Sequence, residues 1–254
     1  MKIEYLGQSG LKFNHKDNCI LVDPYLSNSV QEIDSSDLKR KVPIIYKPEE
    51  IRNVSFILFT HDHIDHCDPH TVPIIAENNP DAKFIGPFPV REELKKWNIE
   101  NSRIIDLKDS QIDLGNGIKA LPVPAAHPKI VISNDGFPKA IGWLIEHHNH
   151  RIYIAGDTSV NQEIINFLKN LPNINLAILP VNEDNFFRRR RGIIGNMSIR
   201  EAFHLADELK IKKLFPVHWD MFDCNSALPE EIKVIYKGYN WKFKLIKNIS
   251  ETNF

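Results

Sequence analysis

The hexapeptide His61-Asp-His-Ile-Asp-His66 concentrates potential metal ligands in one short stretch, namely His61, His63, Asp65 and His66. Imidazole and carboxylate groups suit zinc, manganese or iron. The hexapeptide follows an apolar run that predicts a strand, and a strand-to-helix turn can aim alternate side chains at one point. His61 and His63 can share one cation, while Asp65 and His66 reach a second. A single histidine is more often structural, but a cluster this dense at a strand end predicts a metal site.

The rest of a metal shell must come from distant parts of the chain. His127, Asp157 and His218 each follow an apolar run, and Gly156 allows the backbone a close approach beside Asp157. Asp23 likewise follows an apolar run, although many strands end in Asp for turn-forming reasons. Taken singly, each residue is more often structural, since an Asp before Thr often caps a helix. Together with the hexapeptide, His127, Asp157 and His218 supply enough ligands for two cations.

The sequence predicts that strands deliver these side chains. Short apolar runs bounded by Gly, Pro, Asn or Asp are typical of strands, and we predict them at residues 3–6, 19–22, 55–59, 83–85, 118–123, 140–145, 151–154, 176–179 and 213–217. Amphipathic spacing predicts helices over residues 161–170 and 198–209, with Ser198 and Glu201 forming a capping box. Residues 69–77 and 89–97 are weaker helix candidates. Strands dominate early and alternate with helices later, which is typical of an α/β fold.

Composition excludes several classes of protein. The 254 residues are 42% hydrophobic, enough for a sizeable core, and 32 Lys and Arg balance 33 Asp and Glu. This balance argues against a nucleic-acid or membrane-surface binder, whose affinity would rest on a basic excess. The three cysteines are far apart and odd in number, which favours a reducing compartment. With no apolar run suited to a signal peptide or a membrane span, we expect a cytoplasmic protein.

The ligand set resembles the signature of the metallo-β-lactamase-fold hydrolases, His-x-His-x-Asp-His followed by a distant His, Asp and His. All seven positions have counterparts in the same order, and the match runs from residue 3 to about residue 220. The resemblance implies a single domain over residues 1–254, folded as a four-layer αβ/βα sandwich of two mixed β-sheets flanked by helices. It also implies that the first cation binds His61, His63 and His127, the second binds Asp65, His66 and His218, and Asp157 bridges them.

Four further segments are similar to the branch of this family that contains L-ascorbate-6-phosphate lactonase. They are Gly7-Gln-Ser-Gly10, Val22-Asp-Pro24, the stretch 179–185 and Pro216-Val-His-Trp-Asp220. Oligomers are common in this branch, so a homo-oligomer is among the expectations. The branch implies a small anionic substrate, such as a phosphorylated sugar lactone.

The run of four arginines at residues 188–191 bears on substrate binding. Such a run is often a solvated or interfacial charge cluster. Alternatively, one or two guanidinium groups clamp a phosphate or carboxylate, since their planar fork binds such groups bidentately. Four adjacent arginines cannot all point one way. We predict Arg188 and Arg189, with the nearby Asn185, as substrate-binding residues.

The predicted reaction is hydrolysis by a metal-bound hydroxide, with one or two zinc or manganese ions, or iron, as cofactors. Asp65 would both hold a cation and handle the proton, and attack on a lactone would open its ring to a hydroxy acid. The main alternative is a phosphodiesterase that acts on a small phosphodiester, and a further one is a metal-binding scaffold without turnover. An oxygen-reducing di-iron protein is disfavoured, because that branch has an acid where this chain has His63.

Overall fold

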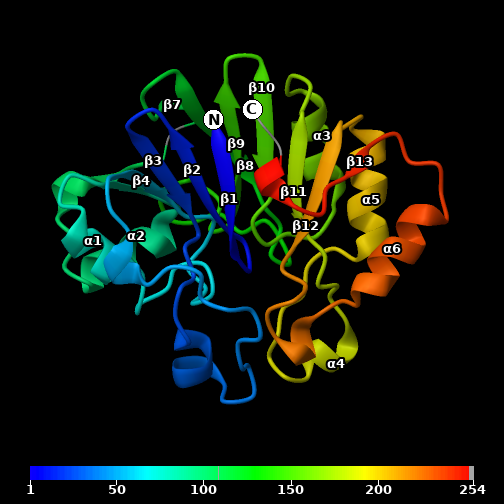
Figure 1. Cartoon of the computed structure of the whole chain (residues 1–254), viewed down its shortest axis with the longest axis horizontal. Helices are drawn as coiled ribbons and strands as arrows, with labels where there is room; N and C mark the ends of the chain where they lie inside the picture. The colour runs from blue at the N-terminus through cyan, green and yellow to red at the C-terminus, as the bar shows by residue number, and fades with distance from the viewer. Residues whose placement is uncertain (108, 252–254) are drawn as a thin grey trace.

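Two β-sheets lie face to face, with helices on their outer surfaces (Figure 1). The computed structural model describes residues 1–107 and 109–251. The first sheet has the order β1-β2-β3-β4-β5-β6 and consists of β1 (Lys2–Gly7), β2 (Gly10–His15), β3 (Asn18–Val22), β4 (Val54–Leu58), β5 (Lys83–Ile85) and β6 (Ile104–Ile105). The second has the order β13-β12-β11-β10-β9-β8-β7 and consists of β7 (Ile112–Asp113), β8 (Ile118–Pro124), β9 (Ile141–His147), β10 (His150–Ile154), β11 (Leu176–Pro180), β12 (Lys213–Val217) and β13 (Lys244–Leu245).

Helices cover the outer face of each sheet (Figure 1). The first sheet carries α1 (Val72–Asn78) and α2 (Phe88–Lys96), and the second carries α3 (Gln162–Lys169), α5 (Ile199–Glu208) and α6 (Pro229–Lys237). A short π-helix (Val30–Asp34) and α4 (Phe186–Arg189) lie apart from these layers, below the lower edge of the sheets in Figure 1. None of the helices in the described ranges is long and apolar enough to cross a membrane.

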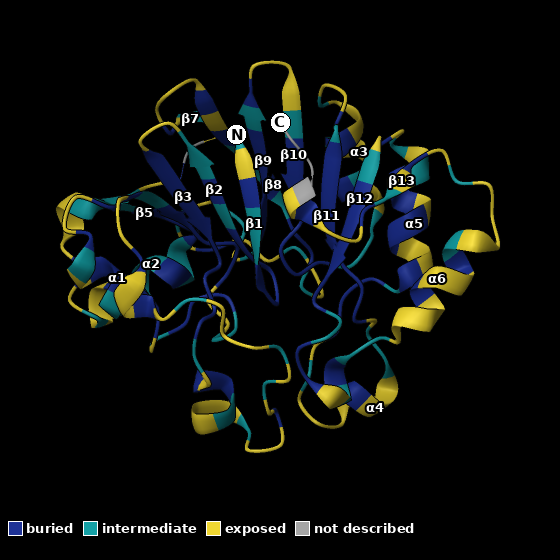
Figure 2. Cartoon of the chain, in the orientation of Figure 1, coloured by how far each residue is buried: buried dark blue, intermediate teal, exposed yellow. Residues whose placement is uncertain are grey.

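Strand periodicity explains the layers, because successive side chains of a strand point to opposite faces. In β4, Leu58 joins the hydrophobic cluster between the sheets, while Ile57 joins the cluster beneath α1 and α2. In β10, Ile154 faces the space between the sheets, and Tyr153 faces the cluster beneath α3, α5 and α6. Figure 2 shows the strands largely buried and the helices exposed on their outward sides. Each fully buried Leu or Ile contributes roughly 1.5–3 kcal/mol.

Each sheet combines antiparallel and parallel pairs. β1, β2 and β3 pair antiparallel, and β3 to β6 pair parallel. In the second sheet, β7 to β10 pair antiparallel and β10 to β13 pair parallel. The carboxyl ends of parallel strands meet at one edge of a sheet, which is where α/β folds place their ligands.

The structure confirms the predicted fold class of two mixed sheets flanked by helices. Every predicted strand coincides with an observed strand to within a few residues, and the two weaker helix candidates correspond to α1 and α2. The capping box at the start of α5 is also confirmed: Ser198 Oγ accepts from the Glu201 N–H, and the Glu201 carboxylate accepts from the Ser198 N–H. The sequence reasoning missed β2, β6, β7, β13, α4 and α6.

Candidate metal centre

The residues predicted to bind metal come from both sheets and converge at one edge. His61, His63, Asp65 and His66 lie in the loop that follows β4 of the first sheet. In the second sheet, His127 follows β8, Asp157 follows β10 and His218 follows β12. The loops after these strands lie at the lower edge of the sheets in Figure 1. The two sheets therefore each supply part of one centre.

All seven side chains fall into groups whose ligand atoms are close enough to hold a cation. Within each group the nitrogen or carboxylate atoms lie within 4.8 Å of one another. The groups are His61, His63 and His127; His61, His66 and Asp157; and Asp65, His66 and His218. The first and third are the ligand sets that the family resemblance implies. The group that contains Asp157 shares one histidine with each of them, which agrees with the bridging position implied for this carboxylate.

Contacts of Asp157 link the groups directly. Its Oδ1 lies 3.2 Å from Nε2 of His66, and its Oδ2 lies 3.3 Å from Nε2 of His218 and 3.8 Å from Nε2 of His127. Nε2 of His218 also lies 3.2 Å from Oδ2 of Asp65. The atoms of four chain segments thus crowd around a single small volume.

Unsatisfied atoms at this centre fit a bound cation. His61 Nε2, His66 Nε2 and Asp157 Oδ1 are buried and lack a hydrogen-bond partner, although the last two approach one another. Leaving such an atom buried and unpaired costs about 1–3 kcal/mol. These three residues form one of the candidate metal groups. Cations held by the two implied ligand sets would contact all three atoms, so the residues present fit the group that they are predicted to hold.

The electrostatics of the third group favour positive charge between its members. Burial alone would lower the pKa of His66 and of His218, but the carboxylates of Asp157 and Asp65 outweigh it, so that the pKa of His66 is well above its usual value and that of His218 is raised to about 9. Burial would likewise raise the pKa of Asp65 and Asp157, yet the neighbouring imidazoles hold both below the usual range. Protons on the two histidines therefore supply, without a metal, the charge that a cation would bring.

In the first group the histidine pKa values are lowered rather than raised. Burial lowers the pKa of His127 to about 4, and burial together with the neighbouring His66 holds the pKa of His61 well below its usual value. Both rings are neutral at pH 7, the form in which imidazole binds a metal. This group can accept a cation without releasing a proton from either residue.

Asp23 contacts a candidate ligand, although the sequence indicated it only as an acid that, like Asp157, follows an apolar run. It is fully buried, and its Oδ2 lies 2.8 Å from Nδ1 of His66. The same carboxylate accepts hydrogen bonds from the N–H and the hydroxyl of Thr60. A carboxylate behind a ligating imidazole fixes which ring nitrogen carries the proton and thereby orients the other one. The position of Asp23 directly after an apolar run was therefore a usable signal.

Gly156 permits the close approach that its sequence position predicted. Its φ of +61° lies in the left-handed region, and a Cβ there would meet the Thr60 side chain at 2.6 Å and the Ile141 carbonyl oxygen at 2.9 Å. Only glycine fits without displacing these neighbours. Since Thr60 precedes His61 and Gly156 precedes Asp157, this contact brings the ligand loops of the two sheets together.

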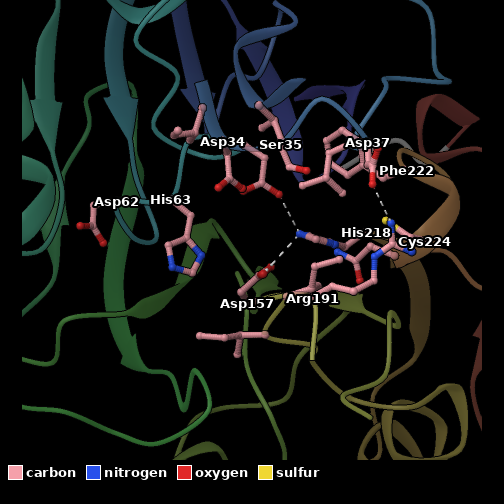
Figure 3. A pocket seen from close by; sticks show the side chains of 18 residues that line it. Asp34, Ser35, Asp37, Asp62, His63, Asp157, Arg191, His218, Phe222 and Cys224 are labelled. Carbon is pink, nitrogen blue, oxygen red and sulfur yellow. Dashed lines mark hydrogen bonds and ion pairs between the residues drawn. The ribbon is translucent and has the colours of Figure 1, made fainter. Parts of the chain in front are cut away.

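A cavity of about 570 Å³ opens onto the centre (Figure 3). Its lining includes four of the candidate ligands, His63, Asp65, Asp157 and His218. Its sides are formed by the π-helix and the segment after it, by the loop after α4, and by the segment after β12, represented by Val30, Asp34, Asp37, Leu38, Arg191, Ile193, Phe222 and Asn225. The volume suits a small molecule rather than a polymer.

None of the three residues predicted to bind substrate lines this cavity. Arg188 is buried, and its guanidinium donates to the backbone carbonyls of Glu183, Cys224 and Ser226. The exposed Arg189 pairs with Asp184, and the Asn185 side chain caps α4 by accepting from the N–H groups of Phe187 and Arg188. Each side chain thus has a local structural partner.

Arg191 is the member of the arginine run that does line the cavity. Its guanidinium lies 3.3 Å from the Asp37 carboxylate, and this ion pair spans the mouth between the loop after α4 and the segment after the π-helix (Figure 3). Both side chains are about half exposed or more. The sequence alone included Arg191 in the run but could not single it out.

Comparisons with known proteins identify the family of this chain. The family model described as β-lactamase superfamily domain matches residues 18–219. A UPF0173 metal-dependent hydrolase of Nanoarchaeum equitans is 30% identical over 236 residues, which cover 92% of this chain and 90% of the relative. A probable L-ascorbate-6-phosphate lactonase of Salmonella paratyphi B is 25% identical over 211 residues, which cover 78% of this chain and 58% of the relative.

Solved structures show the same fold. A metallo hydrolase from the hyperthermophilic archaeon Ignicoccus hospitalis superposes with a TM-score of 0.69 at 21% identity, covering 96% of this chain and 93% of that one. The fold, the converging ligand groups and the match over residues 18–219 lead to one assignment. The chain belongs to the β-lactamase superfamily, and it is a metal-dependent hydrolase of that superfamily.

Proposed function

We propose that the protein opens a lactone or a related carboxylic ester of a small anionic molecule, using one or two divalent cations. The observation that carries this proposal is that four of the seven candidate ligands, His63, Asp65, Asp157 and His218, line a 570 Å³ cavity. His61, His63 and His127 would hold the first cation, and Asp65, His66 and His218 the second, with Asp157 between them. Imidazole and carboxylate ligands favour zinc or manganese, with iron as a further candidate.

Cations held by the His and Asp side chains would supply Lewis-acid chemistry at neutral pH, namely a hydroxide nucleophile and stabilisation of developing negative charge. The chain contributes orientation and proton transfer. Asp65 lines the cavity, and its lowered pKa keeps it ionised at neutral pH, so its carboxylate can hold a cation and accept a hydrogen bond from the attacking water. Contact with a cation-bound water would acidify that water, which is how Asp65 could help to handle its proton. Asp23 keeps His66 in one orientation during this step.

Charge at the cavity mouth supports a small substrate with one anionic group. Arg191 is the cationic side chain there, and Asp34, Asp37 and Asp62 are acidic neighbours. Exposed ion pairs are weak, so a substrate phosphate or carboxylate can replace Asp37 as the partner of Arg191. The acidic neighbours disfavour a long polyanion such as a nucleic acid. The similarity to the lactonase supports a phosphorylated sugar lactone as substrate.

Two adjoining ligand groups also suit a phosphodiester, since paired cations can stabilise both the attacking and the leaving oxygen. This is the second candidate reaction.

For location, we propose the cytoplasm, because all three cysteines are unpaired, as expected in a reducing compartment.

A screen of the metal-reconstituted protein tests these proposals. Sugar lactones, with and without a phosphate, and small phosphodiesters are offered to the wild type and to Asp65→Ala, while metal content is measured on each sample. We expect acid release from the phosphorylated lactones by the wild type alone. Turnover of phosphodiesters only would select the second reaction, and full metal loading without any turnover would indicate a binding scaffold.

A further inference from the structure

Gln8 occupies a position at the metal centre that the family signature does not include. It lies in the turn between β1 and β2, with a φ of +56° in the left-handed region. Its carbonyl oxygen accepts hydrogen bonds from the hydroxyl of Tyr5 at 2.8 Å and from the N–H of His218 at 3.0 Å. Non-glycine residues rarely adopt this conformation, and these two bonds hold it in place. The turn is therefore anchored to the same segment that carries the ligand His218.

The side chain of Gln8 is fully buried and ends between two candidate ligands. Its Nε2 donates to Asp65 Oδ2 at 2.6 Å and lies 2.9 Å from Nε2 of His218. These are the side chains that, with His66, form the third ligand group. The amide N–H group thus stands where positive charge is favoured in this group.

The other end of the carboxamide has no partner. Gln8 Oε1 is buried without a hydrogen bond, and a buried carbonyl oxygen normally has at least one. A half-turn of the carboxamide exchanges its nitrogen and oxygen while the rest of the side chain stays in place. The carbonyl oxygen then faces Asp65 and His218, at a spacing close to the roughly 3 Å between neighbouring ligands in a metal shell.

We propose that Gln8 is an additional ligand of the cation held by Asp65, His66 and His218. This inference rests on the metal centre of the proposed function. An amide oxygen adds a donor without adding charge, and it suits a hard or borderline cation such as manganese or zinc. The third group, with Gln8 added, would then bind its cation through both oxygen and nitrogen donors, whereas the first group consists of three imidazoles.

The consequence is that Gln8 sets the affinity for one cation and leaves the other unchanged. We would titrate the metal-free protein with zinc in competition with a chromophoric chelator, and separately with cobalt while recording the visible spectrum. The variants are Gln8→Met, which keeps the length but removes the oxygen, and Gln8→Glu, which keeps an oxygen. Ser9→Ala is the matched control in the same turn, because its buried hydroxyl lacks a hydrogen-bond partner.

We expect Gln8→Met to weaken binding of one of the two ions by about 10- to 100-fold, and to alter the cobalt spectrum of that ion alone. Gln8→Glu should retain or tighten binding, and Ser9→Ala should match the wild type. Equal or tighter binding by Gln8→Met would overturn the proposal, since the amide would then compete with the cation for Asp65 and His218. If Gln8→Met fails to fold, weakened binding by Gln8→Glu would overturn it instead.

Ion binding by the wild type tests the metal centre, and ion binding by Gln8→Met tests the role of Gln8. If the wild type binds no ion, the metal centre itself is refuted. If the wild type binds two ions and hydrolyses its substrate while Gln8→Met binds both equally well, only the assignment of Gln8 is refuted.

Discussion

Oδ2 of Asp23 lies 2.8 Å from Nδ1 of His66, and both side chains are fully buried. Because a carboxylate accepts hydrogen bonds, the contact places a proton on Nδ1 and leaves Nε2 of His66 facing Asp157. Thr60 donates to the same carboxylate through its N–H and its hydroxyl, so Asp23 cannot rotate away. Asp23, at the end of β3, therefore fixes the orientation of His66, the candidate ligand that follows β4.

Replacing Asp23 by Asn should weaken metal binding without emptying the site of ligands. The amide keeps the volume and can still accept from Thr60, but its NH₂ group would face Nδ1 of His66 and favour the tautomer with the proton on Nε2. We expect about a 10- to 100-fold loss of metal affinity, measured by chelator competition. The neutral substitution Asp113→Asn, in β7, serves as a control. Unchanged affinity in Asp23→Asn would show that the contact does not orient the ligand.

Metal affinity at the third ligand group should rise with pH. In the metal-free protein the carboxylates of Asp157 and Asp65, acting against burial, raise the pKa of His218 to about 9, so a cation must displace a proton from this ring below that pH. Because His66 of the same group is also protonated, affinity should increase by up to tenfold per pH unit for each proton displaced between about pH 7 and pH 9. His127, whose pKa burial lowers to about 4, has no proton to release in this range. A calorimetric titration in buffers of different ionisation enthalpy would measure the protons released, and pH-independent binding of both ions would contradict the expectation.

The same shift predicts how the metal-free protein responds to pH. The folded-state pKa of His218 is raised above its ordinary value of 6.5, so protonation stabilises the folded state. That contribution is fully present below about pH 6.5 and is lost as the pH rises towards 9. We expect the melting temperature of the metal-free protein to fall across this window, and His218→Gln to show a smaller fall. A melting temperature that rises over the same range would contradict the assignment.

Arg191 should govern the recognition of anionic substrates. Arg191→Ala should raise KM for a phosphorylated substrate by about 10-fold or more, the loss expected for a charge-assisted hydrogen bond, with little change in kcat. Asp37→Asn removes the competing carboxylate and should leave KM unchanged or lower it. Steady-state kinetics with phosphorylated and unphosphorylated forms of one substrate would separate charge recognition from a general disturbance. An equal effect of Arg191→Ala on both forms would argue against the role.

Substitutions of Arg188 and of Arg189 should differ in their effect on protein stability, and neither should affect substrate binding. Arg188→Met leaves the carbonyls of Glu183, Cys224 and Ser226 without their shared donor, and we expect it to lower the free energy of unfolding by about 3 kcal/mol. Arg189→Ala removes an exposed ion pair with Asp184 and should have little effect on stability. Urea denaturation measures both. A stable Arg188→Met variant with a raised KM would restore Arg188 as a substrate-binding residue.

The candidate ligands could be located from the sequence because each of the four chain segments that carry them follows an apolar strand. An apolar run followed by His or Asp is a local pattern, and the parallel strands then bring such positions to one edge. Gln8 and Asp23 were harder to recognise, since a single amide or a turn-forming Asp has many ordinary roles. Their importance appears only when β1 and β3 are placed beside the loops that carry His218 and His66.

The sequence could not show which arginine of the run at residues 188–191 faces the cavity. α4 spans only Phe186–Arg189, too short for a hydrophobic stripe to reveal which side faces inward. Arg188, within α4, is buried, whereas Arg191, beyond the end of α4, lines the cavity. Strands β6, β7 and β13 have two residues each, so neighbouring strands determine them more than their own sequence does. α6 buries only Ile232 and Ile235, which makes a weak apolar pattern.

Because both sheets contribute candidate ligands, the complete set can assemble only late in the synthesis of the chain. His61 leaves the ribosome long before His218, which follows β12 near the end of the second sheet. A nascent chain can therefore hold at most part of the ligand set until the second sheet has folded onto the first. Selection of the cation then falls to the finished protein, and the ions that are free in the cell at that moment compete for a site whose shape is already set.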